Sequence, residues 1–72
     1  MEEVQLSGIF GNKICRVRWI RPDTYRVSAD GVLTGHIKRE NGGWMLEDVS
    51  GELLTAENVQ LIGEKLDQRM RK

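Results

Sequence analysis

The chain has 72 residues, a formal net charge of zero, 39% hydrophobic residues and 31% charged residues. This length allows one domain over residues 1–72 with a small core, and the composition is that of a folded rather than a disordered protein. No apolar run is long enough to span a membrane, and the start lacks a signal-peptide pattern, so we expect a cytoplasmic protein. Cys15 is the only cysteine and His36 the only histidine, which excludes an internal disulfide and the usual zinc ligand sets.

Charge is unevenly distributed along the chain. Residues 13–39 contain seven Lys and Arg side chains against two Asp, whereas residues 40–57 contain five Asp and Glu and no Lys or Arg. Either neighbouring strands neutralise each other, or the protein has two faces of opposite sign. The first arrangement needs no external partner and is the interpretation we favour.

Short strands are predicted in the first two thirds of the chain, because Gly, Asn, Asp and Pro separate segments of alternating apolar and polar residues. The predicted strands lie near residues 3–10, 13–20, 25–29, 32–39 and 44–48. Every connection is short, so consecutive strands are expected to pair in an antiparallel meander of four to five strands, either strongly twisted or partly rolled into a barrel. With one C-terminal helix packed on this sheet, the predicted fold class is α+β.

The helix is predicted over residues 56–70, where the apolar residues change to helical spacing. Thr55 is a suitable N-cap, and Leu54 and Val59 stand at the positions of a hydrophobic staple. Gly63 lies within the apolar stripe, where it costs about 1 kcal/mol relative to alanine. We therefore expect the helix to approach the sheet closely at Gly63.

The Asn-Gly pair at 41–42 predicts the register of one hairpin. Both residue types tolerate positive φ angles and so favour a two-residue type I′ turn. This turn sets Ile37 opposite Leu46 and Arg39 opposite Trp44, which keeps the apolar residues on one face.

The loop at 21–24 predicts which face of the sheet is buried. A loop of odd length places Cys15, Val17 and Trp19 on the same face as the apolar residues of the next strand. This face and the helix stripe together predict the core. Its expected members are Phe10, Val17, Trp19, Tyr25, Val27, Ile37, Trp44, Leu46, Leu53, Val59, Ile62, Leu66 and Met70.

The segment 15–21, CRVRWIR, alternates basic and apolar side chains. Its outward side carries Arg16 and Arg18, and Arg26 joins them from the next strand. Like charges this close repel each other, so they need either carboxylates of the protein or an external anion. The carboxylates expected to neutralise them are Glu40, Glu47 and Asp48. The candidate basic face consists of Arg16, Arg18, Arg26, Lys38 and Arg39.

Three apolar side chains are expected at the surface and form the candidate interface. Ile14 and Ile20 lie on the outward side of the arginine-bearing strand, and Leu61 lies opposite the apolar stripe of the helix. Exposed apolar side chains such as these can contribute to contact with a protein partner.

The sequence shows no catalytic or metal-binding pattern. His36 is expected to form an ion pair with Glu47, and Cys15 is expected to point inward, so the two do not predict a catalytic dyad. The acidic segment 47–52 lacks the spacing of a calcium loop, and the glycines form no phosphate-binding motif. We therefore expect no enzyme activity, no cofactor, no metal and no small-molecule substrate.

The function predicted from these observations is that of a small non-enzymatic binding module. It is expected to contact another protein, or a second copy of itself as a homodimer, through a face or an edge of the sheet. The alternative is nucleic-acid binding through the basic face. That alternative lacks the exposed aromatic side chains on which bases stack, because Trp19 and Tyr25 are expected to face the core.

Overall fold

The computed structural model describes residues 3–70 and contains five strands followed by one helix. The elements are β1 (Glu3–Phe10), β2 (Lys13–Arg21), β3 (Thr24–Ala29), β4 (Val32–Glu40), β5 (Gly43–Val49) and α1 (Ala56–Met70). This arrangement confirms the predicted α+β fold, and each bound lies within one residue of the predicted one.

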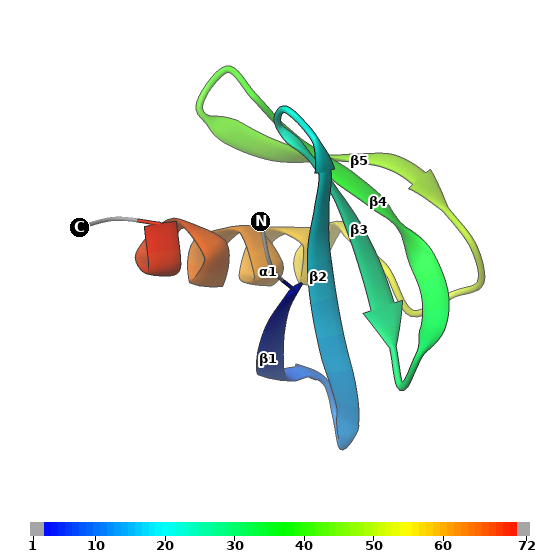
Figure 1. Ribbon diagram of the computed structural model, residues 1–72. Helices are drawn as coiled ribbons and strands as arrows, with labels where there is room; N and C mark the ends of the chain where they lie inside the picture. Colours follow the sequence, from blue (N-terminus) through cyan, green and yellow to red (C-terminus); the bar gives the residue numbers. More distant parts are fainter. Residues whose placement is uncertain (1–2, 71–72) are drawn as a thin grey trace.

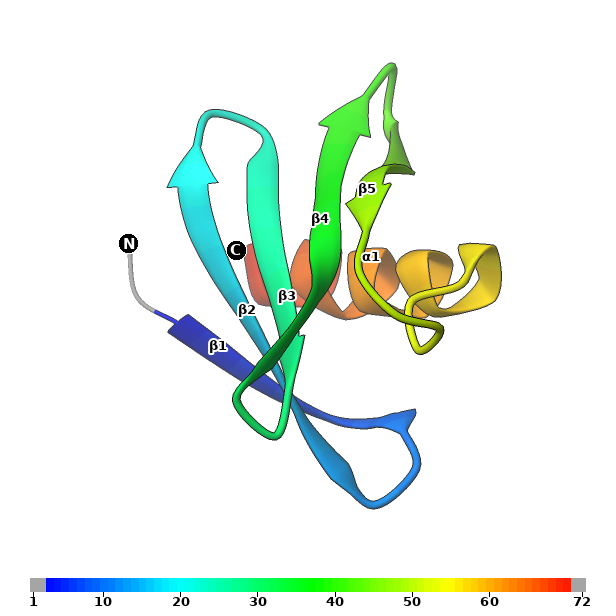
Figure 2. The same cartoon turned by 90° about the vertical axis from the view of Figure 1, so that its right-hand side faces the viewer.

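The strands form a single antiparallel sheet in the order β1-β2-β3-β4-β5, so each strand pairs with its neighbour in sequence. The sheet is twisted and stays open, with β1 and β5 as its edges, rather than closing into a barrel. Figures 1 and 2 show that α1 lies across one side of the sheet. We call this side the helix face and the opposite side the open face.

Both predicted registers are confirmed. Across the turn at 41–42, Ile37 pairs with Leu46 and Arg39 pairs with Trp44. Both turn residues have positive φ angles, as a type I′ turn requires. The β2–β3 hairpin likewise sets the apolar residues of the two strands opposite each other on the helix face.

Two bulges interrupt the alternation of β4 and β5. Ser28 pairs with Leu33 although Val27 pairs with Gly35, so Thr34 is an extra residue on β4. Similarly, Glu47 is an extra residue on β5. Each bulge changes which residues of its strand face the helix, because one added residue reverses the alternation of side chains.

The start of α1 and its contact with the sheet agree with the predictions. Thr55 caps the helix, because its Oγ1 accepts a hydrogen bond from the backbone N–H of Asn58 over 3.2 Å. A side chain at Gly63 would overlap the indole ring of Trp44, so the helix packs directly against this tryptophan. The structure thus confirms the close approach predicted at Gly63.

Side chains of α1 also reach both edges of the sheet. Gln60 Nε2 donates a hydrogen bond to the backbone carbonyl of Trp44 on β5 over 3.1 Å. Arg69 Nη2 donates to the backbone carbonyl of Gln5 on β1 over 3.4 Å. A polar group on each edge strand is therefore paired by the helix.

The core lies between the sheet and α1 and confirms most of the predicted members. The confirmed core residues are Phe10, Val17, Tyr25, Val27, Ile37, Trp44, Val59, Ile62 and Leu66. Leu6, Ile9, Cys15, Ala29 and Leu54 are buried with them. The side chain of Met70, also predicted to be in the core, lies outside the part of the chain that the structure describes.

Three predicted core residues are half-exposed instead. Trp19 lies on the helix face, opposite Tyr25 and near the end of β2, but is 38% exposed. Leu46 is 41% exposed because it lies on β5, an edge strand with no neighbour on one side. Leu53 is exposed because the next residue, Leu54, takes the buried staple position before the helix.

Candidate functional site

A row of charged residues crosses the open face of the sheet. Strand pairing aligns Glu3, Arg18, Arg26, His36 and Asp48, one from each of β1 to β5. The middle of this row is basic and both of its ends are acidic. The residues directly opposite one another in such a row lie about 4.5–5.5 Å apart at Cβ, so their charges interact.

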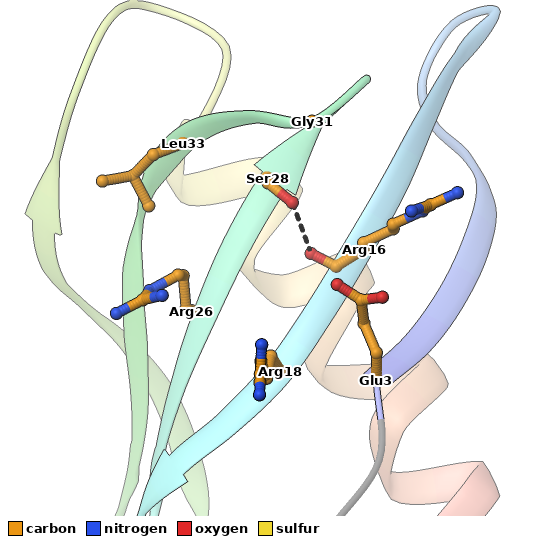
Figure 3. Close-up of a pocket in the computed structure, with 7 residues that line it drawn as sticks. All are labelled: Glu3, Arg16, Arg18, Arg26, Ser28, Gly31 and Leu33. Carbon is orange, nitrogen blue, oxygen red and sulfur yellow. Dashed lines mark hydrogen bonds between the residues drawn. The ribbon is translucent and has the colours of Figure 1, made fainter.

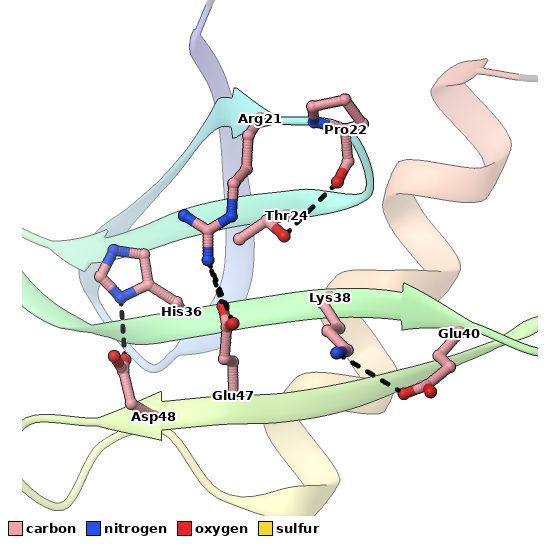
Figure 4. Close-up of polar contacts among 8 residues, drawn as sticks. All are labelled: Arg21, Pro22, Thr24, His36, Lys38, Glu40, Glu47 and Asp48. Carbon is pink, nitrogen blue, oxygen red and sulfur yellow. Dashed lines mark hydrogen bonds and ion pairs between the residues drawn. The ribbon is translucent and has the colours of Figure 1, made fainter.

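On the half of the open face formed by β4 and β5, acidic side chains contact basic side chains (Figure 4). Glu47 accepts two hydrogen bonds from Arg21 Nη2, over 3.1 and 3.3 Å, and Arg21 reaches it from the end of β2. Asp48 Oδ1 accepts a hydrogen bond from His36 Nδ1 over 2.8 Å. The third pair joins Lys38 to Glu40 over 3.9 Å. We call this half of the face, with its three pairs of acidic and basic side chains, the paired half.

On the half formed by β2 and β3, Arg16, Arg18 and Arg26 are arranged differently. None of the three forms an ion pair with a carboxylate of residues 3–70. We call them the arginine cluster. Figure 3 shows their guanidinium groups fanning out over the face rather than converging on one point.

The arginine cluster lines a hollow of about 300 Å³. Its other lining residues are Glu3, Ser28, Gly31 and Leu33. Ser28 Oγ donates a long hydrogen bond of 3.5 Å to the backbone carbonyl of Arg16, so the floor of the hollow is polar. Leu33, whose side chain is 42% exposed, adds apolar surface to the lining of the hollow.

The acids expected to neutralise the arginine cluster are used elsewhere. Each of Glu40, Glu47 and Asp48 contacts a basic side chain of the paired half instead. The predicted neutralisation of the three arginines of the cluster by these carboxylates is therefore wrong within residues 3–70, and Glu47 contacts Arg21 instead. His36 was expected beside Glu47 and contacts Asp48, because Glu47 is the bulged residue of β5.

The structure does not bring all five predicted basic residues together. Lys38 lies on the open face but belongs to the paired half. Arg39 lies on the helix face, where its guanidinium carbon is 5.6 Å from the centre of the Trp44 ring. Its Nη1 also donates to Asp67 Oδ1 over 2.7 Å. Arg39 therefore holds α1 against the sheet and does not contribute to a basic open face.

The predicted interface residues are also separated. Ile14 is 40% exposed and lies beside the arginine cluster, in a second hollow of about 320 Å³. Ile20 is partly buried at the bulge near the end of β2. Leu61 is half-exposed, but on α1, which covers the helix face. Leu61 and Ile14 cannot share one flat contact surface.

Cys15 and His36 lie on opposite faces of the sheet, so they do not form a dyad. Cys15 is buried on the helix face, and burial raises the pKa of its thiol to about 11. Its thiolate, the reactive form, is therefore scarce at neutral pH. The pKa of Tyr25, also on the helix face, is raised mainly by burial.

Within residues 3–70, no group of three or more His, Cys, Asp or Glu side chains has the arrangement needed to hold a metal ion. In the same range, no helix combines the length and the apolar character needed to cross a membrane. Comparisons of the chain with models of protein families, with curated proteins and with solved structures gave no match.

Proposed function

We propose that this protein is a non-enzymatic binding module that holds an acidic segment of another protein on its open face. The observation that carries the proposal is the contrast within that face. Arg21, His36 and Lys38 each contact a carboxylate, whereas the arginine cluster contacts none within residues 3–70. Three adjacent guanidinium groups repel each other unless an anion neutralises them, so an acidic partner would stabilise the arrangement.

The surroundings of the arginine cluster favour a short acidic segment over a nucleic acid. Glu3 and Asp48 end the charged row across the sheet, and Asp30 lies beside the second hollow. A long phosphate backbone would meet these carboxylates, because it needs a continuous basic track. The Phe, Trp and Tyr residues of the chain all lie on the helix face or in the core, so none of these large rings offers a stacking platform on the open face.

The face of the sheet is a better binding surface than its edges. Strand addition to an edge uses the unpaired backbone groups of the outer strands. On each edge strand, a side chain of α1 already pairs with one of these carbonyls. The arginine cluster on the open face meets no such obstacle.

The test is an NMR titration of the labelled protein with three probes: a peptide of alternating Glu and Ser, one of alternating Lys and Ser, and a single-stranded oligonucleotide of mixed sequence. The acidic peptide should shift the amide signals of residues 14–18 and 26–33. Arg16→Glu combined with Arg18→Glu should weaken its binding about tenfold, if each exposed ion pair contributes about 0.7 kcal/mol. The control is Lys13→Glu combined with Lys65→Glu, which changes the net charge equally outside the cluster.

Three outcomes would overturn the proposal. The absence of shifts with the acidic peptide would remove the anion site. Tighter binding of the oligonucleotide at near-physiological salt, weakening about 20-fold from 50 to 200 mM as contact with three phosphates requires, would establish the nucleic-acid alternative. Shifts of the same residues with protein concentration alone would identify a second copy of this chain as the partner.

A further inference from the structure

The arginine cluster has a second hollow beside it that is lined differently. This hollow is formed by Ile14, Arg16, Asp30 and Gly31. Arg16 and Gly31 also line the first hollow, so the two hollows adjoin each other. Asp30 is occupied within the fold, because its Oδ1 accepts a hydrogen bond from the backbone N–H of Ile14 over 2.9 Å.

Apolar surface gathers at this end of the open face. Ile14 and Leu33 are each about two fifths exposed on this face. Leu33 is on the open face because the bulge at Thr34 reverses the alternation of β4. A purely acidic segment would leave all of this apolar surface in water.

We infer that the partner segment is extended and carries an apolar side chain at a fixed distance from its acidic ones, an inference that rests on the proposed function. Arg18, Arg16 and Ile14 alternate along the open face of β2 at spacings of two residues. They therefore cover about 13 Å from the first to the last. In an extended peptide every second side chain also points to one side. The matching pattern is acidic, any residue, acidic, any residue, apolar.

Charge and spacing both argue for an extended strand rather than a helix. A helix rises only about 1.5 Å per residue and would need roughly nine residues to cover the same distance. Its acidic and apolar side chains would then have to follow a spacing of three and four residues. The alternation on β2 has a period of two, which an extended segment reproduces directly.

The test uses three seven-residue peptides whose sequences read the same in both directions. The first is Leu-Ser-Glu-Ser-Glu-Ser-Leu, the second replaces both leucines by serine, and the third is Ser-Leu-Glu-Ser-Glu-Leu-Ser. The third has the composition of the first, but its leucines point away from the glutamates in an extended chain. We expect the first peptide to bind about tenfold more tightly than either of the others, measured by the same NMR titration.

Two variants of the protein localise the effect. Ile14→Ser should weaken binding of the first peptide about fivefold and leave the second unchanged, because only the first has an apolar side chain to lose contact. Leu61→Ser is the matched control, since Leu61 is equally exposed on α1, and it should change neither affinity.

The outcomes separate this inference from the proposed function. Equal affinities of all three peptides, with loss of binding on Arg16→Glu and Arg18→Glu, would overturn the apolar contact and leave the acidic one. Equal affinities of the first and third peptides, both tighter than the second, would overturn the extended conformation. Failure of all three to bind would overturn both proposals.

Discussion

Both halves of the open face carry basic side chains, but only in one half do these side chains contact carboxylates of residues 3–70. In the paired half, acids of β4 and β5 contact Arg21, His36 and Lys38. In the arginine cluster, on β2 and β3, no carboxylate of residues 3–70 plays this part. Both halves lie on the same face of one sheet, so the difference depends on which strands carry the acidic residues.

Strand order explains the difference. The acids of residues 40–48 lie on β5 and at the end of β4, so Glu40 and Asp48 reach Lys38 and His36 on β4 directly. Arg21 reaches Glu47 from the end of β2. Its side chain passes over β3, where the neighbouring residue Thr24 is buried. A count of charges along the sequence therefore predicts their balance but not which of them stay available to a partner.

The largest loss of stability is expected at Gly35, where β4 and β5 of the paired half approach each other closely. Gly35 has a φ angle of +149°, and a side chain there would overlap the carbonyl oxygen of Asp48 and approach Leu54 Cδ2 to 2.8 Å. Gly35→Ala should destabilise the protein by about 3 kcal/mol or more, measured by urea unfolding. The control is Gly43→Ala, whose new atom would lie 3.8 Å from the Glu40 carbonyl. Equal losses in both variants would contradict this explanation.

A smaller loss is expected from making the paired half resemble the arginine cluster. Glu47→Gln removes the charge that Arg21 contacts through two hydrogen bonds. The free energy of unfolding should fall by about 0.5–1 kcal/mol, the range of well-oriented exposed ion pairs. Glu64→Gln, on the exposed side of α1, is the control for loss of one negative charge. If both variants lose the same amount, the contact with Arg21 contributes nothing.

The reverse change supplies the arginine cluster with a carboxylate of its own. Ser28 pairs with Arg16 across β2 and β3, so Ser28→Glu places opposite charges face to face. Stability should rise by about 0.5 kcal/mol at low salt, and binding of acidic peptides should weaken because the new carboxylate competes with them. Ser28→Gln, which is similar in size, should show neither effect. An unchanged affinity in Ser28→Glu would mean that peptides bind elsewhere.

The smallest effect is expected from relieving repulsion within the cluster. Arg18 and Arg26 pair directly, so Arg26→Gln removes a like-charge contact. Stability should increase by about 0.3 kcal/mol in dilute buffer, and the gain should vanish in concentrated salt, which screens exposed charges. A loss of stability would show that Arg26 has a favourable partner.

The sheet and helix could be predicted from local signals that act over a few residues. The Asn-Gly turn fixed one hairpin, and Thr55 and Gly63 identified the start of α1 and its contact with the sheet. Each of these signals depends on backbone preference or on a single contact. They carry over to the structure because every strand pairs with its sequence neighbour.

The candidate site was harder to predict because it depends on bulges. Without the extra residue Thr34, strict alternation would place Leu33 on the helix face. Likewise, the bulge at Glu47 gives His36 a different acidic partner from the expected one. Neither bulge has a local signal as clear as a turn, since bulges depend on how two strands fit together. The predicted pairing of Arg39 with Trp44 is confirmed, but the assignment of Arg39 to the basic face was wrong, because this pairing puts its side chain on the helix face.

The path of α1 across the sheet has a consequence for how the chain folds. Each hairpin joins neighbouring segments and can form on its own within microseconds. The helix, in contrast, starts after β5 and ends at β1, where Arg69 contacts Gln5 across 64 residues of sequence. Closing so long a loop carries a larger entropy cost than closing the short loops of the local hairpins. We therefore expect the hairpins to form first and the docking of α1 on β1 to be the late step that joins the two ends of the chain.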